Sequence, residues 1–318
     1  MYYLIVHDDL DGIASAALYC RLKKIPLNEV VLEFSSPATL PNILSSLLKR
    51  RIGNEDVIVI ADLGCNATTF NELVKLISIL KNKGVKIEWY DHHIWDDMWV
   101  KSFLDLDVNL VVDTSTCTAE LIVKSLGYEP DELSKATCAA DLWKWDHNLA
   151  PYLYRLAYIC EKRGLLHELF KRFYEGNILD DECLKLIEDY VSREIENYDK
   201  VLEYTKVFNV NGCKIAITIK DEGPPSRSHV AHYIMARKNV DVVVVYEIGH
   251  GLSFRSMNVD VRSFARALGG GGHLRAAGAK LHIPLHVRIL SLFSRKILLA
   301  YIEKIVRETI SRIGCNRI

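Results

Sequence analysis

The chain has 318 residues, of which 49% are hydrophobic and 25% charged, and its formal net charge at pH 7 is -1. This composition is that of an ordinary globular protein, which excludes a disordered or fibrous chain, and the length suits two domains with separate cores. The balanced charge gives no sign of a long nucleic-acid track, and no apolar run approaches the roughly 18 residues of a membrane span.

Apolar runs alternate with helix-forming segments over the first 90 residues. We expect strands over residues 2–6, 30–34, 57–60 and 85–89, and helices that begin near residue 13 and span 40–50 and 68–82. Strands separated by helices of about a dozen residues predict a doubly wound, mostly parallel sheet. The ligand site of such a sheet lies beyond the carboxyl ends of its strands.

Acids and imidazoles follow three of these predicted strands. They are His7, Asp9 and Asp11 after the first strand, Asp62 after the third, and Asp91, His92 and His93 after the fourth. Taken singly, an acid in this place is usually a turn or helix-cap residue. Because the carboxyl ends of parallel strands meet at one edge, we predict that these side chains form one site.

From about residue 116 the pattern becomes helical, over residues 117–126, 131–146, 151–174 and 181–204. Asp141 lies there among small and apolar neighbours, where a salt-bridged core residue is the alternative to a site residue. The charged segment 181–204 is typical of a solvated helix that leads into a second domain. We therefore expect a first domain over 1–195, a linker over 196–212 and a second domain over 213–318.

The second domain is predicted to be a smaller α/β fold. We expect its strands over 214–219, 240–246, 252–256 and 277–282 and its helices over 228–237, 261–268 and 290–311. The glycine run 269–272 precedes His273 and is accompanied by Arg255 and Arg275. The N–H groups of such a run can converge on an anion, whereas a lone run is usually a flexible turn. With the cationic neighbours it predicts phosphate or nucleotide binding, and we expect the active site in the cleft between the two domains.

Carboxylates and imidazoles without a thiolate suit hard to borderline divalent ions. Several imidazoles favour Mn²⁺ over Mg²⁺, with Co²⁺ and Zn²⁺ as alternatives. Enough ligands for two ions imply a pair roughly 3.5 to 4 Å apart that shares a carboxylate and activates a bridging water. Such a centre suits in-line attack on phosphorus.

Eight cysteines are scattered along the chain without a C-x-x-C pair. Their spacing excludes a zinc ribbon and predicts thiols that are mostly packed as small hydrophobic residues, rather than disulfides. We therefore expect a cytoplasmic protein with no membrane contact, and we leave a homodimer open.

The motifs together resemble the DHH phosphoesterase superfamily with its DHH-associated C-terminal domain, which includes RecJ-type exonucleases and nano-RNases that also act as pAp phosphatases. The signatures are His-x-Asp-x-Asp-Gly over 7–12, Asp62, Asp91-His92-His93, Asp141, Arg255-Ser256 and Gly-Gly-Gly-His, over nearly the whole chain. One departure concerns His7. Nano-RNases usually place three residues between the first His and Asp-x-Asp, whereas only Asp8 intervenes here, and RecJ-type members carry an acid at this position.

The resemblance also implies roles for single residues. It implies one ion held by His7, Asp9 and Asp62, and a second held by Asp11, Asp62, His92 and Asp141, with Asp62 bridging. Asp91 would orient His92, and His93 would contact the phosphate, so that these two are the catalytic candidates. The implied substrate-binding residues are Arg255, Ser256, Gly270, Gly271, Gly272, His273 and Arg275.

The implied activity is metal-dependent hydrolysis of short oligonucleotides, such as nano-RNA and linear dinucleotides, or of 3′-phosphoadenosine 5′-phosphate. A RecJ-like exonuclease specific for single strands is the alternative, although such bacterial enzymes add an OB-fold for which this chain has no room. A catalytically silent replication or repair scaffold is the third interpretation, and the apparently complete ligand set argues against it.

Overall fold

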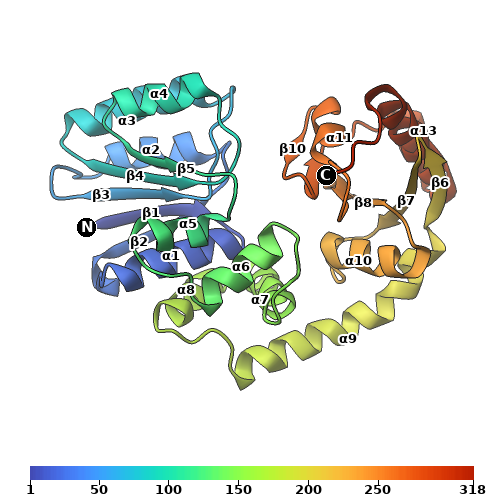
Figure 1. The fold of residues 1–318 in the computed structure, drawn as a ribbon, viewed down its shortest axis with the longest axis horizontal. Coiled ribbons are helices and arrows are strands. Elements are labelled where there is room, and N and C mark those ends of the chain that lie inside the picture. The colour runs from blue at the N-terminus through green and yellow to red at the C-terminus, as the bar shows by residue number, and fades with distance from the viewer. The chain divides into compact units, whose positions relative to one another are not determined.

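The computed structural model describes residues 1–318 and divides into two compact units, Met1–Ile187 and Glu188–Ile318. Figure 1 shows a sheet with helices in each unit. The long helix α9 (Asp181–Glu203) contains the boundary between them. No helix of the chain has both the length and the apolar character that crossing a membrane requires.

The first unit is built on a five-stranded sheet in the order β2-β1-β3-β4-β5, in which every neighbouring pair is parallel. Its strands are β1 (Tyr2–His7), β2 (Val30–Ser35), β3 (Val57–Ala61), β4 (Lys86–Asp91) and β5 (Asn109–Val112). This topology confirms the predicted doubly wound sheet, and it places the ends of β1, β3 and β4 side by side.

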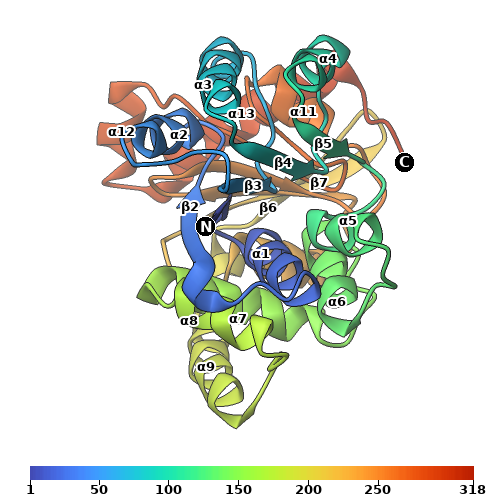
Figure 2. The same ribbon diagram turned by 90° about the vertical axis from the view of Figure 1, so that its left-hand side faces the viewer.

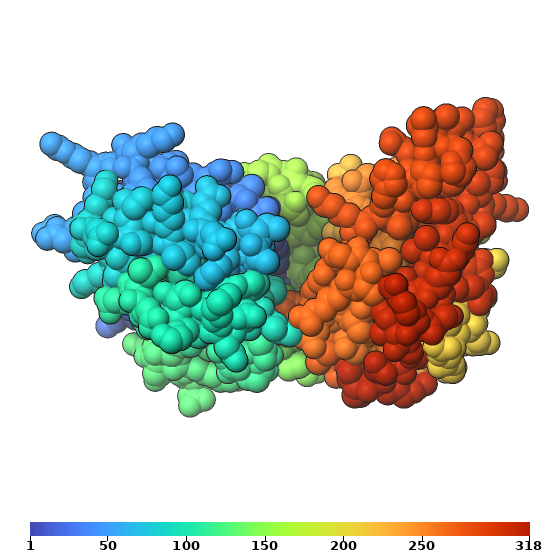
Figure 3. Space-filling model, turned by 90° about the horizontal axis from the view of Figure 1, so that it is seen from above, coloured from blue at the N-terminus to red at the C-terminus, as the bar shows by residue number.

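Helices cover both faces of this sheet (Figures 1 and 2). One face carries α2 (Leu40–Leu48), α3 (Phe70–Asn82) and α4 (Asp97–Asp105), and Figure 3 shows α3 and α4, in cyan to teal, on the surface seen from above. The other face carries α1 (Leu10–Leu22) and α5 (Thr118–Ser125), and a further layer of α6 (Glu132–Asp141), α7 (Ala150–Arg163) and α8 (Leu166–Tyr174) packs against α1. A short 3₁₀ turn, η1 (Leu27–Glu29), precedes β2.

The structure departs from the predicted elements of the first unit where segments are short or end early. The sequence pattern missed α4 and the four-residue strand β5. The helix expected over 131–146 ends at Asp141, because Trp143 and Trp145 adopt positive φ angles of 56° and 58°. The helix expected over 151–174 is two helices, because Gly164 ends α7 in the left-handed conformation.

The second unit contains a mixed six-stranded sheet in the order β10-β11-β9-β8-β7-β6, in which only β7 and β8 run parallel. Its strands are β6 (Lys206–Val210), β7 (Cys213–Lys220), β8 (Val242–Glu247), β9 (Gly251–Arg255), β10 (Gly271–Gly272) and β11 (Ala276–Ala279). Its helices are α10 (Arg227–Lys238), α11 (Arg262–Ala267), α12 (Leu285–Ser291) and α13 (Arg295–Ile313). The smaller α/β fold is confirmed.

Two details of the second unit differ from expectation. Residues 196–212, expected as a linker, contain β6, whose apolar residues Phe208 and Val210 join the core of the second sheet. The strand expected over 277–282 ends at Ala279, and the separate helix α12 follows it. The boundary between the two units therefore lies within α9.

The cysteines divide into two groups. Cys117 is bonded to Cys138 and Cys213 to Cys315, which corrects the expectation that the cysteines are mostly unpaired thiols. The remaining four are buried thiols: Cys20, Cys65, Cys160 and Cys183. Sequence spacing could not find the bonded pairs because their partners are 21 and 102 residues apart.

Gly12 in the first turn of α1 tests how tightly this helix is joined to β1. A Cβ atom at Gly12 would lie 2.2 Å from the carbonyl oxygen of His7, so that Gly12→Ala forces the backbone to move. We expect the free energy of unfolding in urea to fall by about 2 to 3 kcal/mol. Gly53→Ala is the control, because its nearest neighbour would be 4.0 Å away. Equal unfolding free energies for the two variants would contradict this packing.

Candidate metal centre

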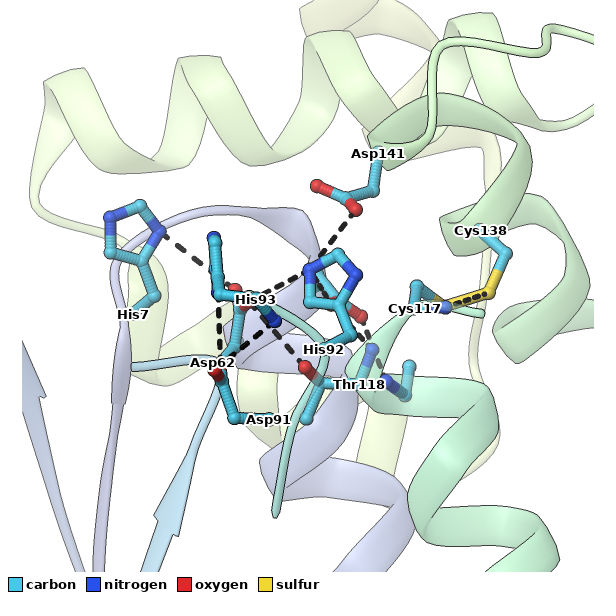
Figure 4. A network of polar contacts seen from close by, with 12 residues as sticks. His7, Asp62, Asp91, His92, His93, Cys117, Thr118, Cys138 and Asp141 are labelled. Atoms are coloured by element: carbon cyan, nitrogen blue, oxygen red, sulfur yellow. Dashed lines mark hydrogen bonds and ion pairs between the residues drawn. A yellow bond between two sulfur atoms is a disulfide. The ribbon is translucent and has the colours of Figure 1, made fainter. Parts of the chain in front are cut away.

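The structure brings the predicted side chains of the first unit together at the carboxyl edge of its sheet (Figure 4). His7 ends β1 and Asp91 ends β4, whereas Asp62 directly follows β3. Asp9 and Asp11 stand at the start of α1, His92 and His93 follow β4, and Asp141 is the last residue of α6. The edge position follows from the parallel topology, which aligns the ends of neighbouring strands.

One group of ligand atoms, which we call cluster A, comes from His7, Asp9 and Asp62, and its atoms lie within 4.8 Å of one another. His7 Nδ1 is 2.7 Å from Asp9 Oδ2 and 3.9 Å from Asp62 Oδ2. Asp9 is also the N-cap of α1, since its Oδ1 accepts a hydrogen bond from the Gly12 amide. The capping role and a place in the cluster are therefore compatible for Asp9.

A second group, cluster B, comes from Asp11, His92 and Asp141, whose ligand atoms also lie within 4.8 Å of one another. His92 Nε2 is 3.7 Å from Asp11 Oδ2 and 3.4 Å from Asp141 Oδ2. Asp141 Oδ2 is buried and accepts no hydrogen bond. A buried carboxylate oxygen without a donor is costly unless a cation completes its environment.

Asp62 stands between the two clusters. Its Oδ2 is the oxygen that faces His7, and its Oδ1 lies 3.4 Å from His92 Nε2. The residue is 3% exposed and has a φ angle of 58°, which is uncommon for a residue other than glycine. Strained backbone of this kind persists where its surroundings hold it, and it is frequent at functional sites.

The segment before α5 holds two ligands of cluster B through its backbone. The amides of Thr118 and Ala119 each donate a hydrogen bond of 2.8 Å to the Asp11 carboxylate. The Thr116 carbonyl accepts a hydrogen bond of 2.9 Å from His92 Nδ1. This bond fixes the tautomer of neutral His92, so that its Nε2 lone pair points into the cluster, as a metal ligand requires.

Thr116, Thr118 and Ala119 were not identified from the sequence as supporting residues. The only available signal was the run of small polar residues over 114–118 between a strand and a helix. Such a run is common at any helix N-terminus, because Ser and Thr cap helices. It therefore gave no reason to connect this segment with Asp11 or His92.

Asp91 supports His93, whereas we had expected it to orient His92. Its Oδ1 accepts a hydrogen bond of 2.9 Å from His93 Nδ1, and its Oδ2 accepts one of 2.6 Å from Trp95 Nε1. The expected role is corrected because the Thr116 carbonyl already occupies His92 Nδ1. Burial alone would lower the pKa of His93, but the Asp91 carboxylate raises it to about 9, so that His93 is protonated at neutral pH.

The acids of the two clusters repel one another. Burial, together with the Asp141 carboxylate, raises the pKa of Asp11 to about 7. Burial and the nearby Asp9 and Asp11 also raise the pKa of Asp62 well above its usual value. Excess negative charge buried beside imidazoles is what divalent cations neutralise. The donor set of carboxylates and imidazoles thus fits hard to borderline divalent ions.

In the second unit, Arg255 lies at the end of β9 beside α10. Its Nε donates a hydrogen bond of 3.2 Å to Ser228 Oγ, and its Nη1 donates one of 3.0 Å to the Phe254 carbonyl. Burial, with His229 and Arg255, lowers the pKa of His232 on the same helix to about 4. Ser228 and His232 were not singled out from the sequence, because they read as ordinary residues of a helix.

Ser256 differs from the expected substrate-binding residue. It is fully buried, and its hydroxyl donates to the Asp241 carbonyl at 2.7 Å and accepts from the Val259 amide at 2.9 Å. The hydroxyl therefore stabilises the turn after β9. A buried side chain whose hydrogen bonds are made within a turn supports the backbone rather than a ligand.

Backbone packing also explains why glycine occupies several positions of the run 269–272. Gly271 and Gly272 form β10, which pairs with β11, and a Cβ atom at Gly272 would lie 2.6 Å from Ala277 Cα. A Cβ atom at Gly270 would lie 2.0 Å from the Gly278 carbonyl oxygen. Gly270 and Gly272 thus permit a close approach of two strands, where an open anion-binding loop was expected. The His273 amide closes the hairpin at 2.8 Å from the Ala276 carbonyl, and Arg275 lies in the turn.

Comparisons with known protein families agree with this architecture. The model of the DHH family, N-terminal domain, matches residues 2–143, and the DHHA1 domain model matches residues 213–297. Both matches confirm the resemblance on which the sequence interpretation relied. No curated protein matches the chain.

Solved structures show the same fold at low sequence identity. RecJ in complex with Mn²⁺ from Thermus thermophilus is 16% identical, with a TM-score of 0.60, and the match covers 99% of this chain and 52% of that one. An exonuclease RecJ bound to manganese is 17% identical, with a TM-score of 0.54 and coverages of 98% and 90%. An exopolyphosphatase-related protein from Bacteroides fragilis is 13% identical, with a TM-score of 0.53 and coverages of 97% and 93%.

The charge of the clusters predicts that metal binding releases protons. His7, whose pKa the Asp9 carboxylate raises to about 11, and Asp11, whose pKa is about 7, carry protons at or below pH 7 that a metal ion must displace. We expect release of about one proton or more per protein, and tighter Mn²⁺ binding as the pH rises from 6 to 8. Calorimetric titration in buffers with different ionisation enthalpies measures this release. A binding enthalpy that is independent of the buffer would contradict it.

Proposed function

Because the chain belongs to the DHH superfamily and carries a DHH-associated C-terminal domain, we propose that it is a metal-dependent phosphoesterase. Asp62 carries the proposal, since its two oxygens face His7 in cluster A and His92 in cluster B. A carboxylate shared by two ligand groups is the arrangement of a two-metal site for phosphoryl hydrolysis.

The two clusters would each hold one divalent ion, with Mn²⁺ as the first candidate. The ions would neutralise the phosphate oxygens and lower the pKa of a water between them. The manganese bound in two RecJ structures of the same fold supports testing this metal first. Asp62 would be a ligand to both ions, and the Thr116 carbonyl would keep His92 in the tautomer that binds metal.

His93 would act directly on the substrate. It is protonated at neutral pH because Asp91 raises its pKa to about 9. A fixed imidazolium stabilises the charge that develops on a phosphate oxygen during attack. Asp91 would hold the ring in place through its hydrogen bond to Nδ1, and Trp95 would hold Asp91.

The substrates we propose are nucleotides and very short oligonucleotides, including nano-RNA, linear dinucleotides and 3′-phosphoadenosine 5′-phosphate. The match of the second unit to the DHHA1 domain supports this choice. Arg255, Gly271, His273 and Arg275 would contact the nucleotide, whereas Ser256, Gly270 and Gly272 would shape the backbone that carries them. A single-strand exonuclease is the second candidate, favoured by the fold shared with RecJ.

Substitution of the shared ligand tests the proposal. Asp62→Ala and His92→Ala should each lower the rate of Mn²⁺-dependent hydrolysis by on the order of 10³-fold or more, because both remove metal ligands. The control is Asp105→Ala, an exposed acid of α4 that pairs only with Lys101 and should keep the wild-type rate. Rates are compared on 3′-phosphoadenosine 5′-phosphate, on dinucleotides and on longer strands. Wild-type rates in Asp62→Ala would refute the two-metal proposal.

The same assay separates the two candidate substrates by chain length. Strands of two to about twenty nucleotides cover both the shortest substrates and the length that a single-strand groove binds. A rate that falls as the strand lengthens supports the nano-RNase proposal. A rate that rises with length favours the exonuclease instead.

A further inference from the structure

The disulfide between Cys117 and Cys138 lies beside cluster B, as Figure 4 shows. Cys117 is the N-cap residue of α5, and Cys138 lies in α6. The phosphoesterase proposal gives neither cysteine a task. Their positions nevertheless connect the two backbone segments that support this cluster.

The segment around Cys117 holds two ligands of cluster B. Immediately before it, the Thr116 carbonyl binds His92 Nδ1, and immediately after it, the amides of Thr118 and Ala119 bind Asp11. A displacement of Cys117 would therefore move the groups that fix Asp11 and His92. These contacts are backbone contacts, so they follow the main chain directly.

The segment around Cys138 carries the third ligand. Asp141 follows Cys138 by three residues and ends α6, which places it roughly 4.5 Å further along the helix axis. Its Oδ2 lies 3.4 Å from His92 Nε2. The disulfide thus ties the helix that carries Asp141 to the segment that holds the other two ligands.

We propose that Cys117 and Cys138 form a redox-modification site that sets the affinity of cluster B for its divalent ion. The inference rests on the proposed function, because it presupposes that cluster B binds a metal. In reduction, a dithiol transfers two electrons and two protons to the disulfide, which yields the Cys117 and Cys138 thiols and the disulfide of the reductant. A small-molecule disulfide reverses the reaction. Exchange begins at Cys138, which is 5% exposed, whereas Cys117 is fully buried.

The size of the expected displacement decides the effect on the metal. Bonded sulfur atoms are about 2.05 Å apart, whereas non-bonded heavy atoms of this kind stay roughly 3.5 Å apart or more. Reduction therefore separates the two sulfur atoms by more than about 1 Å and removes the covalent link between the two supports. Metal–ligand distances tolerate only about 0.2 Å, so a small relative shift of the unlinked supports weakens the fit of cluster B to its ion. Cluster A is affected less, because of its three residues only Asp62 contacts the 116–119 segment, through a hydrogen bond of 3.5 Å from Thr118 Oγ1.

The test measures Mn²⁺ binding to the full chain in its oxidised and reduced forms. Calorimetry and electron paramagnetic resonance should show two ions with coupled spins in the oxidised protein. Reduction should weaken the second site by roughly tenfold or more and remove the coupling, while the affinity of the first site falls less. Cys138→Ser should bind like the reduced protein under both conditions. Circular dichroism of the reduced wild type checks that the fold persists.

The other disulfide provides a matched control. Cys315→Ser breaks the bond to Cys213 in the second unit and should leave both Mn²⁺ affinities unchanged. Equal affinities of the oxidised and reduced protein for two ions would overturn the inference and leave the phosphoesterase proposal intact. Free thiols at Cys117 and Cys138 after treatment with oxidised glutathione, detected by mass spectrometry, would overturn it as well. An oxidised protein that binds no Mn²⁺ would refute the proposed function itself.

Discussion

Repulsion among buried carboxylates at one edge of a parallel sheet is the constraint on which the first unit depends. Asp11 and Asp62 are almost fully buried, and burial with neighbouring acids raises the pKa values of both. Such a group of acids would not persist for packing alone, because an unpaired buried charge is costly. The surrounding structure accordingly supplies compensating groups, which are the imidazoles and the amides at the start of α5.

The need for these compensating groups also explains the backbone conformation at Asp62 and at the start of α5. Asp62 adopts a positive φ angle that directs its two oxygens to different clusters, and the first turn of α5 points its amides at Asp11. A helix N-terminus stabilises a carboxylate through its unpaired N–H groups and its dipole. The sheet therefore provides the positions of the ligands, while α5 and α6 determine how they are oriented. For this reason the disulfide between Cys117 and Cys138, which links α6 to the start of α5, bears on the proposed metal binding at cluster B.

Much of this arrangement was predictable from the sequence, because strand ends and their polar residues can be read from hydrophobic periodicity. The parallel sheet and the grouping of His7, Asp62 and His92 follow from it, whereas the place of Asp141 was expected from the family resemblance. Backbone contacts cannot be read in the same way, since any residue could supply them. For that reason the part played by residues 116–119 was missed, and Asp91 was paired with His92 although it binds His93.

In the second unit, the function of the glycine run could not be predicted from the sequence either. A run of glycines allows both an anion-binding loop and a close approach of strands, and only the pairing of β10 with β11 distinguishes them. Gly270 and Gly272 are required by that close approach, so their presence alone carries no information about a ligand. Ser256 is a similar case, since its neighbour Arg255 made it look like a binding residue, while its hydroxyl completes a turn.

Anomalous diffraction at the manganese absorption edge tests most directly whether Asp62 bridges two divalent ions, as we propose. Crystals grown with Mn²⁺ should show two anomalous peaks roughly 3.5 to 4 Å apart, one in each cluster, with one Asp62 oxygen bound to each ion. A single peak, or two peaks that do not share Asp62, would contradict the account.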